Sequence, residues 1–245
     1  MLRDLAWEGC LNVRELGGLT TEDGAETRFG SVIRADTLGF LTRAGWEALL
    51  AAGVTRIVDL RERFEIDDDL PRELEVEVVH VPIFDRLDER RWEEIEAASA
   101  AAPSHAAATE LVYLRLLDHC RPRFADAVAA VASASGAVVV HCHGGKDRTG
   151  LVAAMLLRLA RVPIDTIADD YAYSAVRLQP RHEEWFAGAA DDEERARMER
   201  IAATPREAIQ AVLEALDVRY GGVDRYLLGG GLTAAELVAA RSRLR

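Results

Sequence analysis

A short buried strand, a glycine-containing loop and an apolar helix follow one another in residues 136–160. Residues 138–140 are three consecutive valines after a glycine, which is typical of a buried strand. The apolar residues after the loop recur at helical spacing and predict a helix: Leu151, Val152, Met155, Leu156 and Leu159. The sequence therefore predicts that Cys142 lies in a tight turn between a strand and a helix N-terminus.

The loop between this strand and this helix can bind an anion. A helix N-terminus directs several backbone N–H groups into one concavity. Gly144 and Gly145 lack a Cβ, so the backbone can adopt left-handed angles and approach a ligand closely. Arg148 lies six residues after Cys142, and its planar guanidinium can bind two oxygens of a phosphate while the sulfur faces the phosphorus.

Cys142 is the candidate nucleophile of this loop. The helix N-terminus, Arg148 and Lys146 favour the thiolate over the neutral thiol, and Thr149 can offer its hydroxyl to the sulfur. A thiolate beside a bound phosphoryl group can attack phosphorus and form a phosphocysteine intermediate, which water then hydrolyses. We expect this reaction to need no metal ion and no other cofactor.

The surroundings of Cys142 are more informative than its spacing from an arginine, which arises by chance in about one such chain in three. Cys10 and Cys120, the other two cysteines, do not lie between a strand-like run and a helix. The chain has 30 Lys and Arg residues, and all of them are arginine except Lys146. A lone lysine inside the loop indicates that a compact positive charge is required there.

The sequence HCHGGKDRTG at residues 141–150 resembles the signature loop of cysteine-dependent phosphatases. Its Gly-Lys-Asp-Arg-Thr-Gly form is similar to bacterial and fungal tyrosine phosphatases, whose members also act on phosphoinositides. Further similarity to that family lies in residues 12–18, 57–61, 170–174 and 220–233, although Glu15 stands where the family usually has aspartate. The resemblance implies a tyrosine-phosphatase-like fold and an acid/base role for Asp147, which matches the loop aspartate of the family.

The remaining site assignments follow from position along the chain. Asp85 follows a candidate strand and is the alternative general acid, whereas the other interpretation of Asp147 is a carboxylate favoured by the helix dipole. His141 precedes the nucleophile and is expected to orient the loop by hydrogen bonding. Asn12 and Arg14 either support the loop or belong to an ordinary turn. The expected phosphate-binding residues, besides Arg148, are His143, Gly144, Gly145, Lys146 and Thr149.

Size and composition favour one phosphatase domain over residues 1–245. The chain is 49% hydrophobic with a net charge of −12, which argues against nucleic acid or an anionic membrane surface as a partner. Three cysteines without framework spacing favour reduced thiols in the cytoplasm. The N-terminus shows no apolar signal region, and no apolar run approaches membrane-spanning length, so secretion without a recognisable signal is the alternative.

The rest of the chain predicts an α/β fold with a central mixed, largely parallel sheet, flanking helices and a helical C-terminal half. Strands are expected at residues 32–34, 54–60 and 76–81, and helices at 42–53, 122–135, 164–178, 205–221 and from 233 onward. One or two helices are expected in 86–118, with Leu111, Leu114 and Leu117 on a shared face and Trp92 either in a lid or on a solvated surface. Residues 180–204 carry no strong apolar stripe.

Three other interpretations of the central loop are weaker. A nucleotide-binding Walker loop would need glycine and Ser or Thr where Val140 and Asp147 stand. A metal site is disfavoured because consecutive residues of an extended chain, such as His141 and Cys142, point to opposite faces. A redox role of Cys142, with Cys10 or Cys120 as partner, we interpret as regulation or damage.

We therefore predict a metal-independent phosphoric monoester hydrolase that acts on phosphotyrosine proteins and, more broadly, on phosphoserine or phosphothreonine. The alternatives are a phosphoinositide phosphatase and a catalytically silent phosphate-binding adaptor. An inositol phosphate would need further basic groups around the mouth of the site, which Arg14, Arg34 or Arg61 could supply if the fold brings them near.

Overall fold

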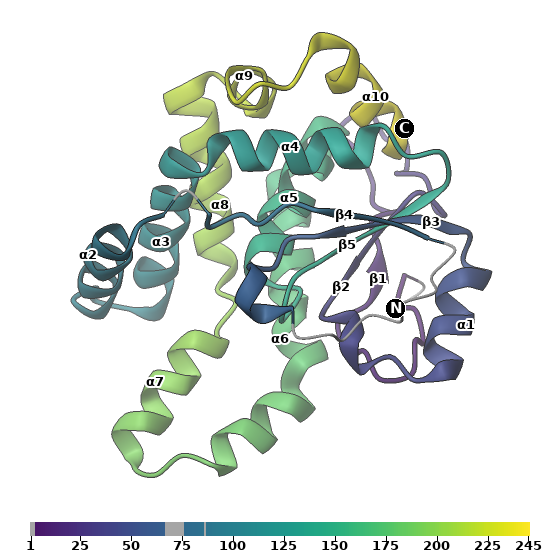
Figure 1. The fold of residues 1–245 in the computed structure, drawn as a ribbon. Helices are drawn as coiled ribbons and strands as arrows, with labels where there is room; N and C mark the ends of the chain where they lie inside the picture. The colour runs from purple at the N-terminus through teal and green to yellow at the C-terminus, as the bar shows by residue number, and fades with distance from the viewer. Residues whose placement is uncertain (1–2, 67–75, 86) are drawn as a thin grey trace.

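A five-stranded sheet is central to the computed structural model, which describes residues 3–66, 76–85 and 87–245 (Figure 1). Its strands are β1 (Arg14–Glu15), β2 (Val32–Ala35), β3 (Val54–Asp59), β4 (Glu77–His80) and β5 (Ala137–His141). Their order in the sheet is β1-β2-β5-β3-β4, with β1 antiparallel to β2 and the other neighbours parallel. The expected mixed, largely parallel sheet is confirmed, and the strand that leads to Cys142 lies in its middle.

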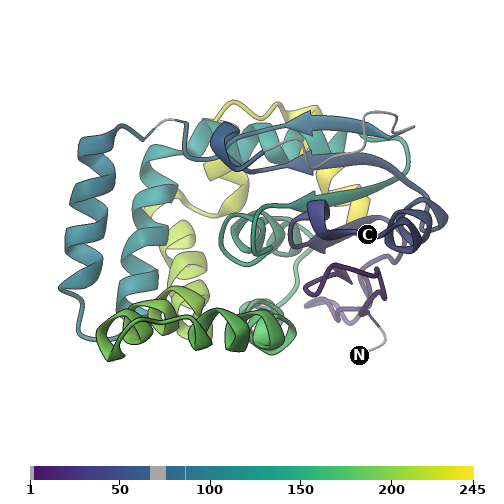
Figure 2. The ribbon, with the colours of Figure 1, turned by 60° about the horizontal axis from the view of Figure 1, so that its bottom comes forward.

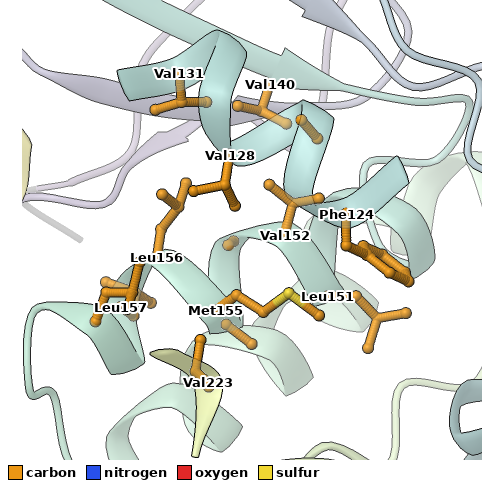
Figure 3. Close-up of a cluster of buried hydrophobic side chains, with 14 of the residues drawn as sticks. Phe124, Val128, Val131, Val140, Leu151, Val152, Met155, Leu156, Leu157 and Val223 are labelled. Atoms are coloured by element: carbon orange, nitrogen blue, oxygen red, sulfur yellow. The ribbon is translucent and has the colours of Figure 1, made fainter. Parts of the chain in front are cut away.

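Alternating side chains of the strands enter two hydrophobic cores, one on each face of the sheet. Val138 and Val140 of β5 pack on one face with helices α4 (Arg121–Ala132) and α5 (Asp147–Leu159), as Figure 3 shows for Val140. Val139 packs on the other face with α1 (Arg43–Ala51) and the N-terminal segment. Because both faces are buried, β5 is apolar from Ala137 to Val140 and does not alternate with polar residues.

The other helices are α2 (Glu89–Ala100), α3 (His105–His119), α6 (Ile164–Ala187), α7 (Asp192–Ala202), α8 (Arg206–Ala215), α9 (Val223–Gly229) and α10 (Ala234–Leu244). Short helical turns occupy Leu38–Phe40, Arg63–Glu65 and Leu216–Tyr220. Helices α2, α3 and α8 lie side by side at one end of the sheet (Figure 2). Among the described residues, no helix is both long and apolar enough to cross a membrane.

Several helix ends lie where capping chemistry predicts them. Thr42 caps α1 by accepting a hydrogen bond from the backbone N–H of Gly45, and Thr233 forms a capping box with Glu236 at α10. Pro122 lies in the first turn of α4, where its missing N–H removes no helical hydrogen bond. These local signals confirm the expected starts of the three helices.

The structure corrects other expectations. Helix α6 continues past Pro180 to Ala187, and α7 follows, although the sequence there has no strong apolar stripe. Arg and Glu after Pro180 are good helix formers and extend the helix despite the lost hydrogen bond. In α3, Leu117 is buried and Leu111 and Leu114 are half-buried, and the buried face extends to Tyr113 and Leu116, which the leucine spacing did not predict.

Candidate active site

Cys142 follows directly on β5, and the loop that it opens ends at the first turn of α5. The register aligns Asp59 with both His141 and His80, so the carboxyl ends of β3, β4 and β5 meet at this edge. Ligands of such sheets collect at this edge. Cys142 is 2% exposed, which leaves its sulfur at the bottom of the loop and not on the surface.

The phosphate loop, residues 142–148, owes its shape to a close approach between backbones. Gly145 has a φ of +63°, and a Cβ there would lie 2.3 Å from the carbonyl oxygen of Ala35. Gly144 has only ordinary contacts around a hypothetical Cβ, the nearest being Leu178 at 3.9 Å. Of the two loop glycines, only Gly145 is therefore required by the backbone itself.

Side chains from the N-terminal segment and β2 hold the outer side of the phosphate loop. The Asn12 amide donates to the carbonyl oxygens of Gly144 (3.1 Å) and Gly145 (3.2 Å), and Arg34 also donates to that of Gly145 (2.7 Å). The backbone N–H of Thr37 donates to the carbonyl of His143 at 2.8 Å. With its carbonyls bound on this side, the loop can turn its N–H groups toward a ligand. Of the two interpretations of Asn12, loop support is the one that the structure favours.

Beneath Asn12 lies a buried charge cluster built on Asp170 of α6. The carboxylate pairs with Arg3 (2.8 Å), Arg14 (3.0 Å) and Arg34 (2.7 Å), and all four side chains are buried. Burial alone would raise the pKa of Asp170, but the three guanidinium groups outweigh it and hold the pKa well below its usual range. Arg14 and Arg34 are thus bound within the protein and do not line the mouth of the site.

Arg148 lies in the first turn of α5 and is held by two groups from other parts of the sheet edge. Both of its terminal nitrogens donate to the carboxylate of Glu65, Nη2 to Oε1 at 2.8 Å and Nη1 to Oε2. The guanidinium also stacks over the ring of Phe84, 4.8 Å from its centroid. Arg148 interacts electrostatically with Cys142, so the cation and the sulfur share one site.

Glu65 is a site residue that sequence reasoning missed. It ends the helical turn Arg63–Glu65, where Glu62 and Glu65 form a reciprocal capping box. Burial raises the pKa of the Glu65 carboxyl, but Arg148 lowers it by a larger amount. The pKa therefore lies below its usual value. The sequence signal was this capping pattern, which begins three residues after Asp59 and says nothing about a partner 83 residues away.

His141 is fully buried beside the nucleophile, between two groups. One ring nitrogen, Nδ1, lies 3.3 Å from the carbonyl oxygen of Cys142, and the other, Nε2, lies 3.6 Å from Oδ1 of Asp59. Asp59 in turn forms a buried ion pair with Arg61 at 2.8 Å. Arg61 is therefore also bound within the protein, and an orienting role of His141 stays a prediction.

The two candidate acids have different surroundings. Asp147 lies in the first turn of α5, where Lys146 (2.9 Å) and the hydroxyl of Tyr113 (2.6 Å) both reach its Oδ1. Asp85 instead gives both carboxylate oxygens to Arg123 of α4. The fold therefore holds Asp147 at the phosphate loop through Lys146 and Tyr113, and it ties Asp85 to α4.

The remaining loop residues differ in exposure. His143 is exposed and Gly144 half-buried, whereas Lys146 and Thr149 are buried. The Thr149 hydroxyl has no hydrogen-bond partner within the described part of the chain, so the expected contact with the sulfur is absent from the geometry. Over the same residues, no three His, Cys, Asp or Glu side chains converge as a metal site would require.

Comparison with known proteins agrees with this geometry. Residues 5–245 match the model of the tyrosine phosphatase family. The chain is 31% identical to a tyrosine-protein phosphatase of Nostoc commune, over 86% of this chain and 73% of that protein. It is 26% identical to the triple specificity protein phosphatase PtpB of Mycobacterium tuberculosis, over 95% of this chain and 99% of that protein. A buried cysteine, a helix N-terminus and a fixed arginine at one sheet edge thus accompany the sequence match, and the chain belongs to the tyrosine phosphatase family.

Proposed function

We propose that this chain hydrolyses phosphotyrosine in proteins through a phosphocysteine intermediate on Cys142. The observation that carries the proposal is the pairing of a buried cysteine at the end of the central strand with Arg148, whose orientation is fixed by Glu65 and Phe84. Glu65 takes one N–H from each terminal nitrogen of Arg148. Nη1 also donates to the carbonyl of Leu60 at 3.5 Å, so that, among the described residues, the Nε–H and the second N–H of Nη2 remain for two phosphate oxygens.

The proposed reaction has two steps. The Cys142 thiolate attacks phosphorus, the bond from phosphorus to the phenol oxygen breaks, and Asp147 gives its proton to that oxygen. Asp147, now a carboxylate, takes a proton from a water molecule, whose oxygen attacks phosphorus and releases inorganic phosphate and the thiolate. Arg148 and the loop amides bind the phosphoryl oxygens in both steps and stabilise the charge that develops on them.

The surroundings of the loop favour an aromatic phosphate ester over a phosphoinositide. Phe84 lies against Arg148, and the ring of Trp92 packs edge-on against Phe84 with centroids 5.0 Å apart. An aromatic surface of this kind suits the ring of a phosphotyrosine. Arg14, Arg34 and Arg61, which could have served the additional phosphates of an inositol, are buried and paired.

Parallel assays of phosphate release test this proposal. The substrates are a phosphotyrosine peptide, matched phosphoserine and phosphothreonine peptides, and a phosphoinositide, each with a chelator and a reductant present. We expect release chiefly from the phosphotyrosine peptide, and none from the variant Cys142→Ser. Cys10→Ser is the matched control, because Cys10 is also a buried thiol but donates to the carbonyl of Thr37.

Each alternative has its own outcome in these assays. Faster phosphate release from the phosphoinositide than from the phosphotyrosine peptide would indicate that the substrate is a lipid headgroup and not a protein. Phosphopeptide binding without release would indicate a silent adaptor. Release that the chelator abolishes, or that Cys142→Ser retains, would overturn the cysteine mechanism.

We also propose the cytoplasm as the compartment of this chain. Cys10, Cys120 and Cys142 are all free and buried. Burial raises the pKa of Cys120 to about 12, and it also raises that of Cys10. Buried cysteines without disulfide partners are typical of proteins in a reducing compartment. Localisation of a tagged chain by fractionation tests this proposal.

A further inference from the structure

Asp147 receives two hydrogen bonds on one oxygen. The hydroxyl of Tyr113, from α3, donates to Oδ1 at 2.6 Å, and the Lys146 ammonium donates to the same oxygen at 2.9 Å. An oxygen that accepts two hydrogen bonds in this way does not itself carry the acidic proton. A protonated Asp147 therefore bears its hydrogen on Oδ2.

The other oxygen of Asp147 faces a different environment. Within residues 3–66, 76–85 and 87–245, no donor reaches Oδ2. The Asp147 side chain as a whole is 40% exposed, although both of its flanking side chains, Lys146 and Arg148, are buried. Oδ2 is thus the oxygen that can exchange a proton with a bound ester or with water.

Tyr113 is itself held firmly. It is 2% exposed, and its hydroxyl lies 2.7 Å from that of Tyr171 of α6. Because Tyr113 gives its own hydrogen to Asp147, Tyr171 must be the donor between the two phenols. Burial and the nearby charge of Asp147 raise the pKa of Tyr113 well above its usual value, so it remains a donor throughout the pH range of an assay.

We propose that Tyr113 is a positioning residue for the general acid: it fixes the Asp147 carboxyl so that Oδ2 presents the proton to the leaving oxygen. This inference rests on the role of Asp147 proposed above. It assigns a function to α3, whose Tyr113 lies 34 residues before Asp147 in the sequence. The α2–α3 pair then contacts both parts of the site, since Trp92 of α2 packs on the ring beneath Arg148.

The test compares Tyr113→Phe, Asp147→Asn and the double variant on two substrates, phenyl phosphate and 4-nitrophenyl phosphate. The first has a poor leaving group that needs a proton, and the second a good one that does not. For Tyr113→Phe we expect kcat to fall about 10-fold on phenyl phosphate and less than about 2-fold on 4-nitrophenyl phosphate, with KM unchanged. In the Asp147→Asn background, Tyr113→Phe should have no further effect.

Two further variants keep the test decisive. Tyr226→Phe makes the same chemical change at a buried phenol whose hydroxyl donates to the carbonyl of Leu117, and it should leave both rates unchanged. If Tyr113→Phe fails to fold, Tyr171→Phe removes the donor behind Tyr113 and should give the same substrate-dependent loss, at smaller size.

Three results would overturn the inference. The first is an equal loss on both substrates, and the second is a full additional loss in the Asp147→Asn background. Either would leave the proposed acid role of Asp147 intact, provided that Asp147→Asn itself acts on the poor leaving group. If Asp147→Asn instead slows both substrates alike, the acid role fails as well.

Discussion

Glu65 binds Arg148 through both carboxylate oxygens, although the two residues come from different segments of the sheet edge. The contact fixes the guanidinium before any ligand arrives, which spares the entropy of ordering a long side chain during binding. It also balances one of the positive charges next to the phosphate loop. The Glu65 carboxylate therefore contributes to the anion site by orienting Arg148, although its own negative charge would repel a bound phosphate.

Replacing Glu65 with glutamine should weaken this arrangement. The amide oxygen can still accept one hydrogen bond, but the amide nitrogen would face a second N–H donor of Arg148. We expect kcat/KM on a phosphotyrosine peptide to fall about 10- to 100-fold, which corresponds to about 1.4 to 2.7 kcal/mol. Glu62→Gln is the matched control, because its amide oxygen can still accept from the N–H of Phe84. Equal losses in both variants would mean that only net charge matters.

Arg148→Lys tests the fork geometry of the cation. An ammonium is a point charge and cannot bind Glu65 and two phosphate oxygens in one plane. We expect the variant to lose most of its activity, about 100-fold or more in kcat/KM, with inorganic phosphate also binding more weakly. Steady-state kinetics with phosphate as a competitive inhibitor measure both effects. Near-normal turnover would contradict the role assigned to the guanidinium.

The two loop glycines should respond differently to alanine. Gly145→Ala places a Cβ 2.3 Å from the Ala35 carbonyl oxygen at a φ of +63°, which costs at least about 1–2 kcal/mol for the backbone angle alone. We expect reduced thermal stability and loss of most phosphate release. Gly144→Ala, whose Cβ would meet only ordinary contacts, should keep both close to the original chain. A larger loss in Gly144→Ala than in Gly145→Ala would contradict the different backbone roles of the two glycines.

Asp170→Asn should destabilise the fold in a pH-dependent way. Removing the charge leaves three buried guanidinium groups without their counter-ion, which typically costs about 3–5 kcal/mol. Because the folded pKa of Asp170 is depressed, its contribution is fully present above the unfolded pKa of about 3.9. It is then lost as the pH falls from there toward the lower folded value.

Urea unfolding at several pH values measures this contribution. The difference in unfolding free energy between the original chain and Asp170→Asn should be constant from pH 7 to about 5 and should shrink below about 4. A difference that stays constant down to pH 3 would show that the carboxylate is not depressed by its neighbours.

The strand, loop and helix around Cys142 could be predicted because their signals are local. Three valines, two glycines and a helical apolar repeat lie within one short stretch. The capping residues Thr42 and Thr233 act on the same principle, since each satisfies backbone groups only a few residues away.

The partners of the site residues could not be predicted in the same way. Glu65 and Tyr113 meet the loop across 83 and 34 residues of sequence, and only the packing of the sheet edge and of α3 brings them there. The leucine spacing of α3 likewise did not predict the burial of Tyr113. The spacing of apolar residues predicts which side of a helix is buried. It does not predict that the Tyr113 hydroxyl has hydrogen-bond partners, Asp147 and Tyr171, that allow this side chain to be buried as well.

Because Lys146 is the single lysine of the sequence, a lysine-specific protease can probe the phosphate loop. Lys146 is 8% exposed, and its ammonium donates hydrogen bonds to the Asp147 carboxylate and, at 3.4 Å, to the Ala203 carbonyl. A protease that cleaves only after lysine has a single target in the 245 residues, in the middle of the phosphate loop. In the folded chain that peptide bond is shielded, so the rate of cutting reports how often the loop opens. A phosphate mimic that binds the loop should slow the cut, which gives a binding assay that needs neither turnover nor a label.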